Sequence, residues 1–122
     1  MPRVSVISNG RLAVAFDGQT NVRDLFYPRV GLENHLSGHK LKMGVWADGR
    51  FSWLGDGWQT KTGYMPETLV SRSIAGNAAL QIRIETNDAV HRTHDLFLRK
   101  IMVSNLAQQQ RKLRIFFAHD FH

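Results

Sequence analysis

The chain has 122 residues, of which 43% are hydrophobic, and this suits one globular domain with its own core. The absence of cysteine excludes disulfide scaffolds and thiolate metal sites. The net charge of +6 is expected on a solvated surface, because the basic residues are scattered along the chain. Residues 1–10 hold no apolar run of signal-peptide length, and no run approaches the roughly 20 residues of a membrane span, so we expect a cytoplasmic protein without a membrane partner.

Two hairpins are predicted in the first half of the chain. Each has a turn-favouring dipeptide between two apolar runs: Asn9-Gly10 between residues 4–8 and 11–16, and Asp48-Gly49 between residues 42–47 and 50–54. Such dipeptides favour two-residue primed turns, because these turns need positive φ.

Residues 19–41 are the least regular stretch of the sequence and contain Pro28, Gly31 and Gly38. A long loop in a compact domain is usually functional or disordered. The aromatic pair Phe26-Tyr27 argues against disorder, so this stretch is the first place to look for a functional site.

Further strands are predicted in the second half, at residues 58–64, 68–74, 79–86, 91–105 and 111–122. Turns are expected at residues 55–57, 76–77 and 87–88. Leu80, Ile82 and Ile84 alternate with polar residues, as in a half-buried antiparallel strand. No stretch has the periodicity of a long helix. About seven to nine short strands with frequent turns predict an all-β fold, an antiparallel β-sandwich or open barrel.

Three segments resemble, in order, the N-terminal domain of bacterial and archaeal glucoamylases and glucodextranases of glycoside hydrolase family 15. Residues 23–35 read RDLFYPRVGLENH and are similar to the family segment R-D-x-Y-Y-P-x-V-G-x-x-N-H. Residues 44–53, GVWADGRFSW, resemble the hairpin that follows. Residues 116–121, FFAHDF, resemble the family's F-F-x-H-D-F strand, with Ala118 at a position where histidine is often seen.

The resemblance implies that residues 1–122 are an N-terminal β-sandwich domain, or part of one, within a larger galactose-mutarotase-like supersandwich. In the family, an (α/α)6 barrel with two catalytic glutamates follows the sandwich. The chain does not include that barrel. We therefore expect a non-catalytic module of a glucan 1,4-α-glucosidase type of enzyme, which supports the barrel and its substrate rim. The expected partners are the catalytic barrel and an α-glucan, and no cofactor is expected.

The irregular stretch carries the candidates for a substrate rim or domain interface, namely Arg23, Asp24, Tyr27, Arg29, Asn34 and His35. The alternative is structural: Asp24 pairs with Arg23 or Arg29 and holds the loop. Asp24 and Glu33 are not expected to form a catalytic carboxyl pair, because loop carboxylates commonly bond nearby backbone. No catalytic residue is therefore expected in the chain.

The aromatic residues near the second hairpin support a second hypothesis, an autonomous carbohydrate-binding module. Trp46, Trp53 and Trp58 are the sugar-stacking candidates, and this hypothesis predicts a row of exposed rings on one face. The alternative is that these rings pack in the core and pair across strands.

Two further ligand classes are weighed and not expected. The six histidines supply no set of three or four convergent ligands, so no metal site is predicted. A third hypothesis, a basic β-domain that binds nucleic acid, needs basic residues along one groove. The densest basic cluster, Arg111, Lys112 and Arg114, is too small to support it.

Self-association is expected from the last predicted strand. Residues 113–121 are rich in Phe and Ile, and no later strand in the sequence covers them. Exposed strand edges and apolar patches pair with other chains. We therefore expect a two-fold homodimer with this strand in the contact.

Overall fold

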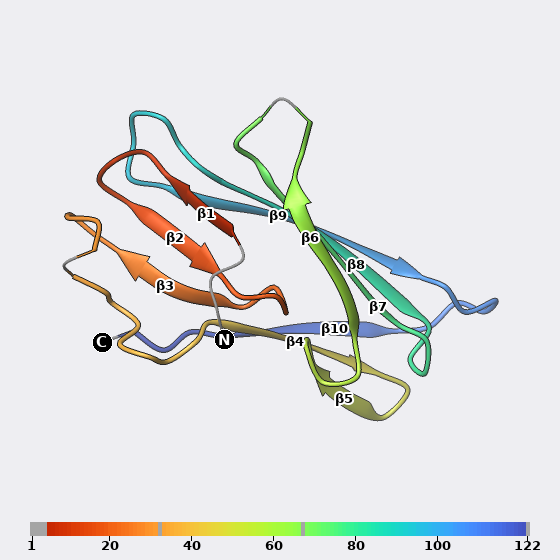
Figure 1. Cartoon of the computed structure of the whole chain (residues 1–122). Helices are drawn as coiled ribbons and strands as arrows, with labels where there is room; N and C mark the ends of the chain where they lie inside the picture. Colours follow the sequence, from red (N-terminus) through yellow and green to blue (C-terminus); the bar gives the residue numbers. More distant parts are fainter. Residues whose placement is uncertain (1–4, 32, 67, 122) are drawn as a thin grey trace.

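The computed structural model describes residues 5–31, 33–66 and 68–121. These residues form ten strands and no helix (Figure 1). In chain order the strands are β1 (Ser5–Ser8), β2 (Ala13–Phe16), β3 (Val22–Phe26), β4 (Lys42–Ala47), β5 (Arg50–Trp53), β6 (Gln59–Tyr64), β7 (Ser71–Asn77), β8 (Ile82–Val90), β9 (Phe97–Asn105) and β10 (Leu113–Ala118). The described chain is therefore all-β, as predicted, and it has no helix that could cross a membrane.

The strands form three antiparallel sheets with the orders β1-β2-β3, β10-β4-β5 and β6-β7-β8-β9. Figure 1 shows the long strands β8 and β9 running from the β1–β3 end of the molecule to the β4–β5 end. The four-stranded sheet packs against both three-stranded sheets, which makes the fold β-sandwich-like.

One hydrophobic cluster lies between the β10-β4-β5 sheet and the four-stranded sheet. Its fully buried members include Val45 of β4 and Ile82 and Ile84 of β8. Ile82 and Ile84 face this core from β8, which confirms the predicted alternation for these two residues. Leu80 is buried in the same core, but it lies in the turn before β8 and not in the strand as predicted. Each such side chain contributes about 1.5–3 kcal/mol by leaving water.

A second cluster lies between the β1-β2-β3 sheet and the far end of β8 and β9. Val14, Phe16, Val22 and Leu36 are buried there, with Phe97 packed beside them. The hydroxyl of Tyr64, at the end of β6, donates to Val6 O at 2.9 Å and accepts from Val6 N at 3.1 Å. This side chain satisfies backbone groups on the outer edge of β1.

The two predicted hairpin turns have different outcomes. Asp48 and Gly49 have φ of 51° and 76° between the paired residues Ala47 and Arg50, so the predicted primed turn is confirmed. The first turn lies one residue later than predicted.

Gly10 has φ of 95°, whereas Asn9 stays outside the turn centre, and Asn9 N donates to Leu12 O at 3.2 Å. The side chain of Asn9 explains this shift. Its Oδ1 accepts from Arg11 N and Leu12 N, and its Nδ2 donates to the carbonyls of His91 and His94.

Three other local predictions were wrong. Residues 19–41 contain strand β3, which pairs with β2. Gly76-Asn77 lies inside β7 and Asn87-Asp88 lies inside β8, and the turn between these strands falls at residues 78–81. Pairing on both sides of β7 and β8 satisfies the backbone and overrides the local turn preference. Residue 4 of the first predicted strand and residue 122 of the last lie outside the described residues.

Candidate functional site

The described part of residues 23–35 forms a tight hairpin that continues β3. Tyr27 N donates to Glu33 O at 3.3 Å, and His35 N donates to Leu25 O at 2.8 Å. The side chain of Asn34 closes the base: its Oδ1 accepts from Leu25 N and Leu36 N. The loop is therefore held by its own hydrogen bonds, and residues 28–31 at its tip are exposed.

Asp24 has a structural role in this loop. Its side chain is buried, accepts from Asn34 Nδ2 at 2.8 Å, and pairs with Arg23 Nη1 at 3.4 Å. The structure thus brings Arg23, Asp24 and Asn34 together, whereas Glu33 is exposed. Arg29 lies at the exposed tip, away from this network.

Tyr27 and His35 line a shallow cavity of about 380 Å³ with Asp95 and Phe121. His35 Nε2 lies 2.6 Å from Tyr27 O. Burial raises the pKa of Asp95, but hydrogen bonds from Arg11, Asn9 and Tyr27 outweigh it and hold that pKa below its usual value. The sequence predicted Tyr27 and His35 as candidates and missed Asp95, because Asp95 lies in a loop much further along the chain.

The outer face of the β10-β4-β5 sheet carries an aromatic face, which we define as Trp46, Phe51, Trp53 and Phe116. Phe51 and Phe116 are 46% and 44% exposed, and both tryptophans are half-buried. The Phe51 ring meets Trp53 edge-on at 4.9 Å and Phe116 at 5.6 Å between centroids. The guanidinium of Arg114 lies 5.2 Å from the Trp46 ring centre. Phe116 joins this face only through the pairing of β10 with β4.

Trp58 does not belong to the aromatic face. It is 8% exposed, lies in the core, and its Nε1 donates to Ser52 Oγ at 2.9 Å. The expectation that Trp58 stacks on a sugar is therefore wrong, because its ring faces Leu80, Ile82 and their neighbours rather than solvent.

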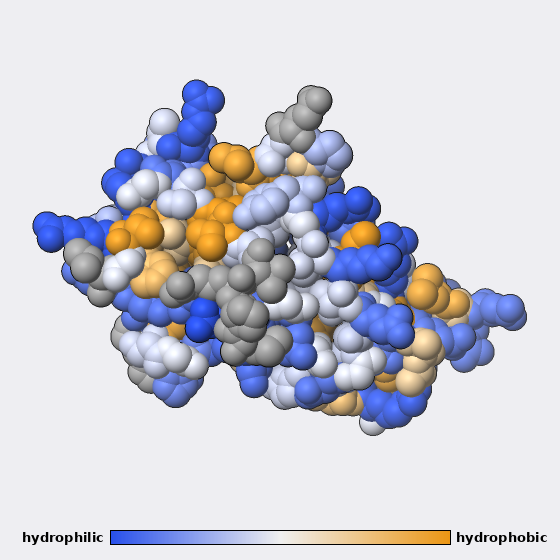
Figure 2. All heavy atoms as spheres, in the orientation of Figure 1, coloured by the Kyte–Doolittle hydropathy of each residue, from blue (hydrophilic) through white to orange (hydrophobic). Residues whose placement is uncertain are grey.

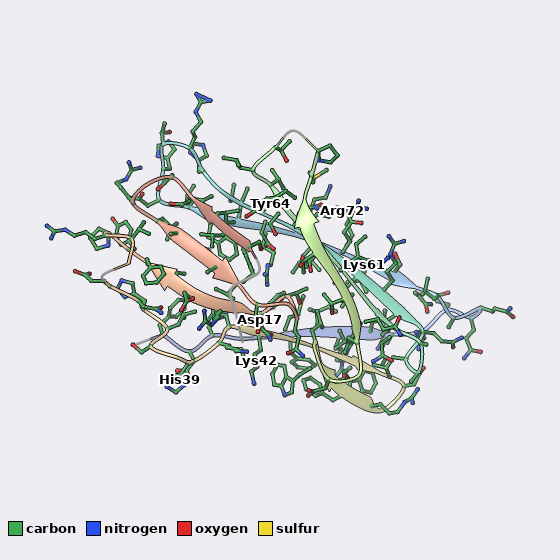
Figure 3. All side chains as sticks on the ribbon, viewed as in Figure 1. Asp17, His39, Lys42, Lys61, Tyr64 and Arg72 are labelled. Carbon is green, nitrogen blue, oxygen red and sulfur yellow. The ribbon has the colours of Figure 1, made fainter. Side chains whose placement is uncertain are left out.

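A polar cavity of about 600 Å³ opens beside Trp53, and we call it the Trp53 cavity. Its principal lining side chains are Gln19, His39, Lys42, Trp53, Asp56 and Asp120. Figure 3 shows His39 and Lys42 on the same side of the molecule, with Asp17 further inside. Apart from Trp53, sequence reasoning missed these residues, because the cavity lining comes from four separate segments of the chain.

A buried carboxylate, Asp17, supports the Trp53 cavity from inside. It accepts from Lys40 Nζ at 2.7 Å, Asn21 Nδ2 at 3.1 Å and Gln19 N at 2.8 Å. Burial raises the pKa of Asp17, but the hydrogen bonds from Lys40, Gln19 and Asn21 outweigh it and lower that pKa overall. Asp17 therefore holds the loop of residues 17–21 against the segment that carries Lys40.

The basic residues do not line one groove. Arg111 is 6% exposed in its side chain and donates to Asp48 Oδ2 at 2.7 Å and to the carbonyls of Leu80 and Gln81. Arg114 stacks on Trp46. Figure 2 shows hydrophilic surface along β6 and apolar surface over β1 and β2. The described residues contain no cluster of three or more metal-ligating side chains.

Comparisons of the chain with models of protein families, with curated proteins and with solved structures find no match. The class of protein that the fold and these sites define is a β-sandwich-like domain. It carries a self-supported loop, an aromatic face and a polar cavity.

Proposed function

We propose that the chain is a non-catalytic module of a glucoamylase-type glycoside hydrolase that acts on α-glucans, within a larger galactose-mutarotase-like supersandwich. The observation that supports this most is the hairpin at residues 23–35, the segment that resembles the family. Asn34 holds its base, and Tyr27 and Arg29 are exposed. A loop already ordered in this way docks on a second domain with little further loss of entropy.

The role proposed for this loop is to contact the catalytic (α/α)6 barrel and shape its substrate rim. Glycoside hydrolysis needs two carboxyl groups on either side of the scissile bond. Asp24 is engaged by Asn34 and Arg23, which argues against its use as an acid or nucleophile. The chain is therefore proposed to supply position and support while the barrel supplies catalysis.

Titration of the chain against a separately expressed (α/α)6 barrel of a glucoamylase-type enzyme tests this proposal. Tyr27→Ala and Arg29→Glu should each weaken association about tenfold, as expected of side chains central to an interface. Lys61→Glu, on the exposed outer side of β6, is the matched control and should have no effect. Association that is absent, or insensitive to the loop variants, contradicts the proposal.

Hydrolysis assays test the non-catalytic role directly. Maltose, starch, dextran and trehalose should give background rates with the chain alone. Turnover that disappears in Asp24→Asn or Glu33→Gln would show that the chain is itself an enzyme.

A second candidate function, an autonomous carbohydrate-binding module, is favoured by the aromatic face. Phe51 and Phe116 are exposed next to Trp46 and Trp53 on one side of one sheet. Aromatic surfaces of this kind can hold the apolar face of a sugar ring. Oligosaccharide binding by the chain without any barrel distinguishes this function from the first.

A further inference from the structure

The Trp53 cavity combines an aromatic wall with polar side chains, unlike a larger cavity elsewhere in the fold. That cavity, of about 690 Å³ beside β6 and β7, is lined mainly by apolar atoms such as those of Ile74, Ile82 and Leu106. The Trp53 cavity, at about 600 Å³, falls within the 300–1,000 Å³ typical of small-molecule sites. It is therefore large enough for a small ligand and has the polar groups to orient one.

Its charges are balanced. The cavity lining contains two lysines, Lys40 and Lys42, and two aspartates, Asp56 and Asp120. Lys40 is already paired with buried Asp17, and His39 Nδ1 lies 3.1 Å from Asp120 Oδ2. A site for a phosphate or a metal cation would carry an excess of one sign. Balanced charges favour a neutral ligand that both donates and accepts hydrogen bonds.

The cavity walls are held in place before any ligand arrives. The loop with Gln19 is fixed by Asp17, and the Gln19 side chain packs on Gly55 and donates to its carbonyl at 3.5 Å. Leu36 is fully buried, and its carbonyl accepts from His39 N at 2.8 Å, which places His39 at the cavity rim. Sites built from pre-ordered side chains lose little entropy on binding.

Trp53 is the apolar wall of this cavity. Its ring is half-buried, and Phe51 holds it edge-on from the other side. It also lies over Gly44, where an added Cβ would meet Trp53 Cε3 at 2.9 Å. A tryptophan with a fixed ring beside carboxylate, imidazole and amide groups matches a ligand with an apolar ring face and a polar edge.

We propose that the Trp53 cavity binds one neutral pyranose unit of an oligosaccharide. The sugar ring packs on Trp53, and its hydroxyl groups bond to His39, Asp56 and Asp120. The choice of an α-glucan as the source of that unit rests on the proposed function, whereas the site itself rests on the cavity.

Calorimetric titration of the full chain with maltotetraose tests the site. Trp53→Ala should weaken binding at least about tenfold, and Asp56→Asn, an exposed position, about threefold. Leu69→Ala is the control: Leu69 is an exposed apolar side chain that does not line the cavity, so its variant should bind as the parent does. Trp46→Ala reports on the aromatic face instead, because Trp46 does not line the cavity. Inorganic phosphate should not compete.

Amide NMR shifts of the unmodified chain give a second measurement that no variant can confound by unfolding. Maltotetraose should shift amides at residues 19–21, 38–42, 53–56 and 118–120. Shifts elsewhere, a loss of binding in Trp46→Ala alone, competition by phosphate, or no binding of any α- or β-linked tetrasaccharide would overturn the inference. Binding of a β-linked but not an α-linked sugar would support the site and count against the α-glucan function. Failure to associate with the catalytic barrel would contradict the proposed α-glucan function and would not bear on the sugar site.

Discussion

Arg99 Nε donates to Asp88 Oδ1 at 2.6 Å across the paired strands β9 and β8, with side chains that are 15% and 2% exposed. The guanidinium also lies 5.6 Å from the ring centre of Phe16 and 5.7 Å from that of Phe97, and its Nη2 donates to Thr20 O at 3.4 Å. This one side chain therefore links the four-stranded sheet to the β1-β2-β3 sheet.

Arg99→Met should lower the free energy of unfolding by about 3–5 kcal/mol at neutral pH, because it leaves a buried carboxylate unpaired. Burial already raises the pKa of Asp88, and Arg99 offsets only part of that effect. A raised pKa gives stability that is present below the unfolded pKa, about 3.8, and is lost as pH rises through the folded pKa. The loss of unfolding free energy in Arg99→Met, relative to the parent chain, should therefore become smaller as pH falls. Denaturant unfolding at several pH values measures it.

The double variant Asp88→Asn, Arg99→Met is the control for that titration. It is compared with Asp88→Asn alone, where the pair has no carboxylate, so the further loss of stability caused by Arg99→Met in that background should not vary with pH between about 4 and 7. A single variant whose defect is equally independent of pH would contradict the assignment to Asp88.

Asp17→Asn should lower the free energy of unfolding by about 2–3 kcal/mol at neutral pH, because it weakens the charged hydrogen bonds from Lys40 and two backbone amides. The pKa of Asp17 is lowered, so its stabilisation is present above about pH 3.8 and is lost as pH falls through the folded pKa. Thermal unfolding from pH 7 to 2 should show the gap between the parent and the variant narrowing in acid. Asp56→Asn, at an exposed turn, should follow the parent throughout.

Asn34→Ala should destabilise the chain by about 2 kcal/mol, because three hydrogen bonds at the base of the loop are lost. Amide hydrogen exchange at Leu25 and Leu36 should accelerate, since their N–H groups lose the Asn34 acceptor. Glu33→Ala, next to it but exposed, should change stability by less than about 0.5 kcal/mol. Unchanged exchange in Asn34→Ala would mean that the loop is held by other contacts.

Gly44→Ala should lower the free energy of unfolding by about 1–3 kcal/mol, because the added Cβ would overlap the rings of Phe51 and Trp53. The same substitution in a Phe51→Ala background should cost less, since that ring is gone. A double-mutant cycle on unfolding free energies measures the coupling. Additive effects would show that the rings move aside without cost.

Self-association through β10 remains a prediction with a structural basis. Phe116, Phe117 and Phe121 are 44%, 49% and 59% exposed, and β10 is an edge strand of its sheet. Sedimentation at micromolar concentration should show a dimer that Phe117→Ser shifts toward monomer. Val30→Ser, which removes a similarly exposed apolar side chain outside β10, should leave the dimer intact. A parent chain that sediments as a monomer would contradict this prediction.

The all-β class, the Asp48-Gly49 turn and the inward face of Ile82 and Ile84 could be predicted from the sequence. These features follow from φ preferences and from the alternation of side chains along a strand, which depend on near neighbours in the chain. The resemblance of residues 23–35 to family 15 glucoamylases stays a prediction, as do the module and partners that it implies.

Which side chains contact one another could not be predicted from the sequence and depends on how the strands pair and the sheets pack. The tertiary structure placed Trp58 in the core, brought Phe116 beside Phe51, and assembled the Trp53 cavity from separate segments. Asp88, which was expected in a turn, lies inside β8 and is the buried partner of Arg99. These contacts depend on strand register and on how the sheets pack, and neither leaves a periodic signal in the sequence.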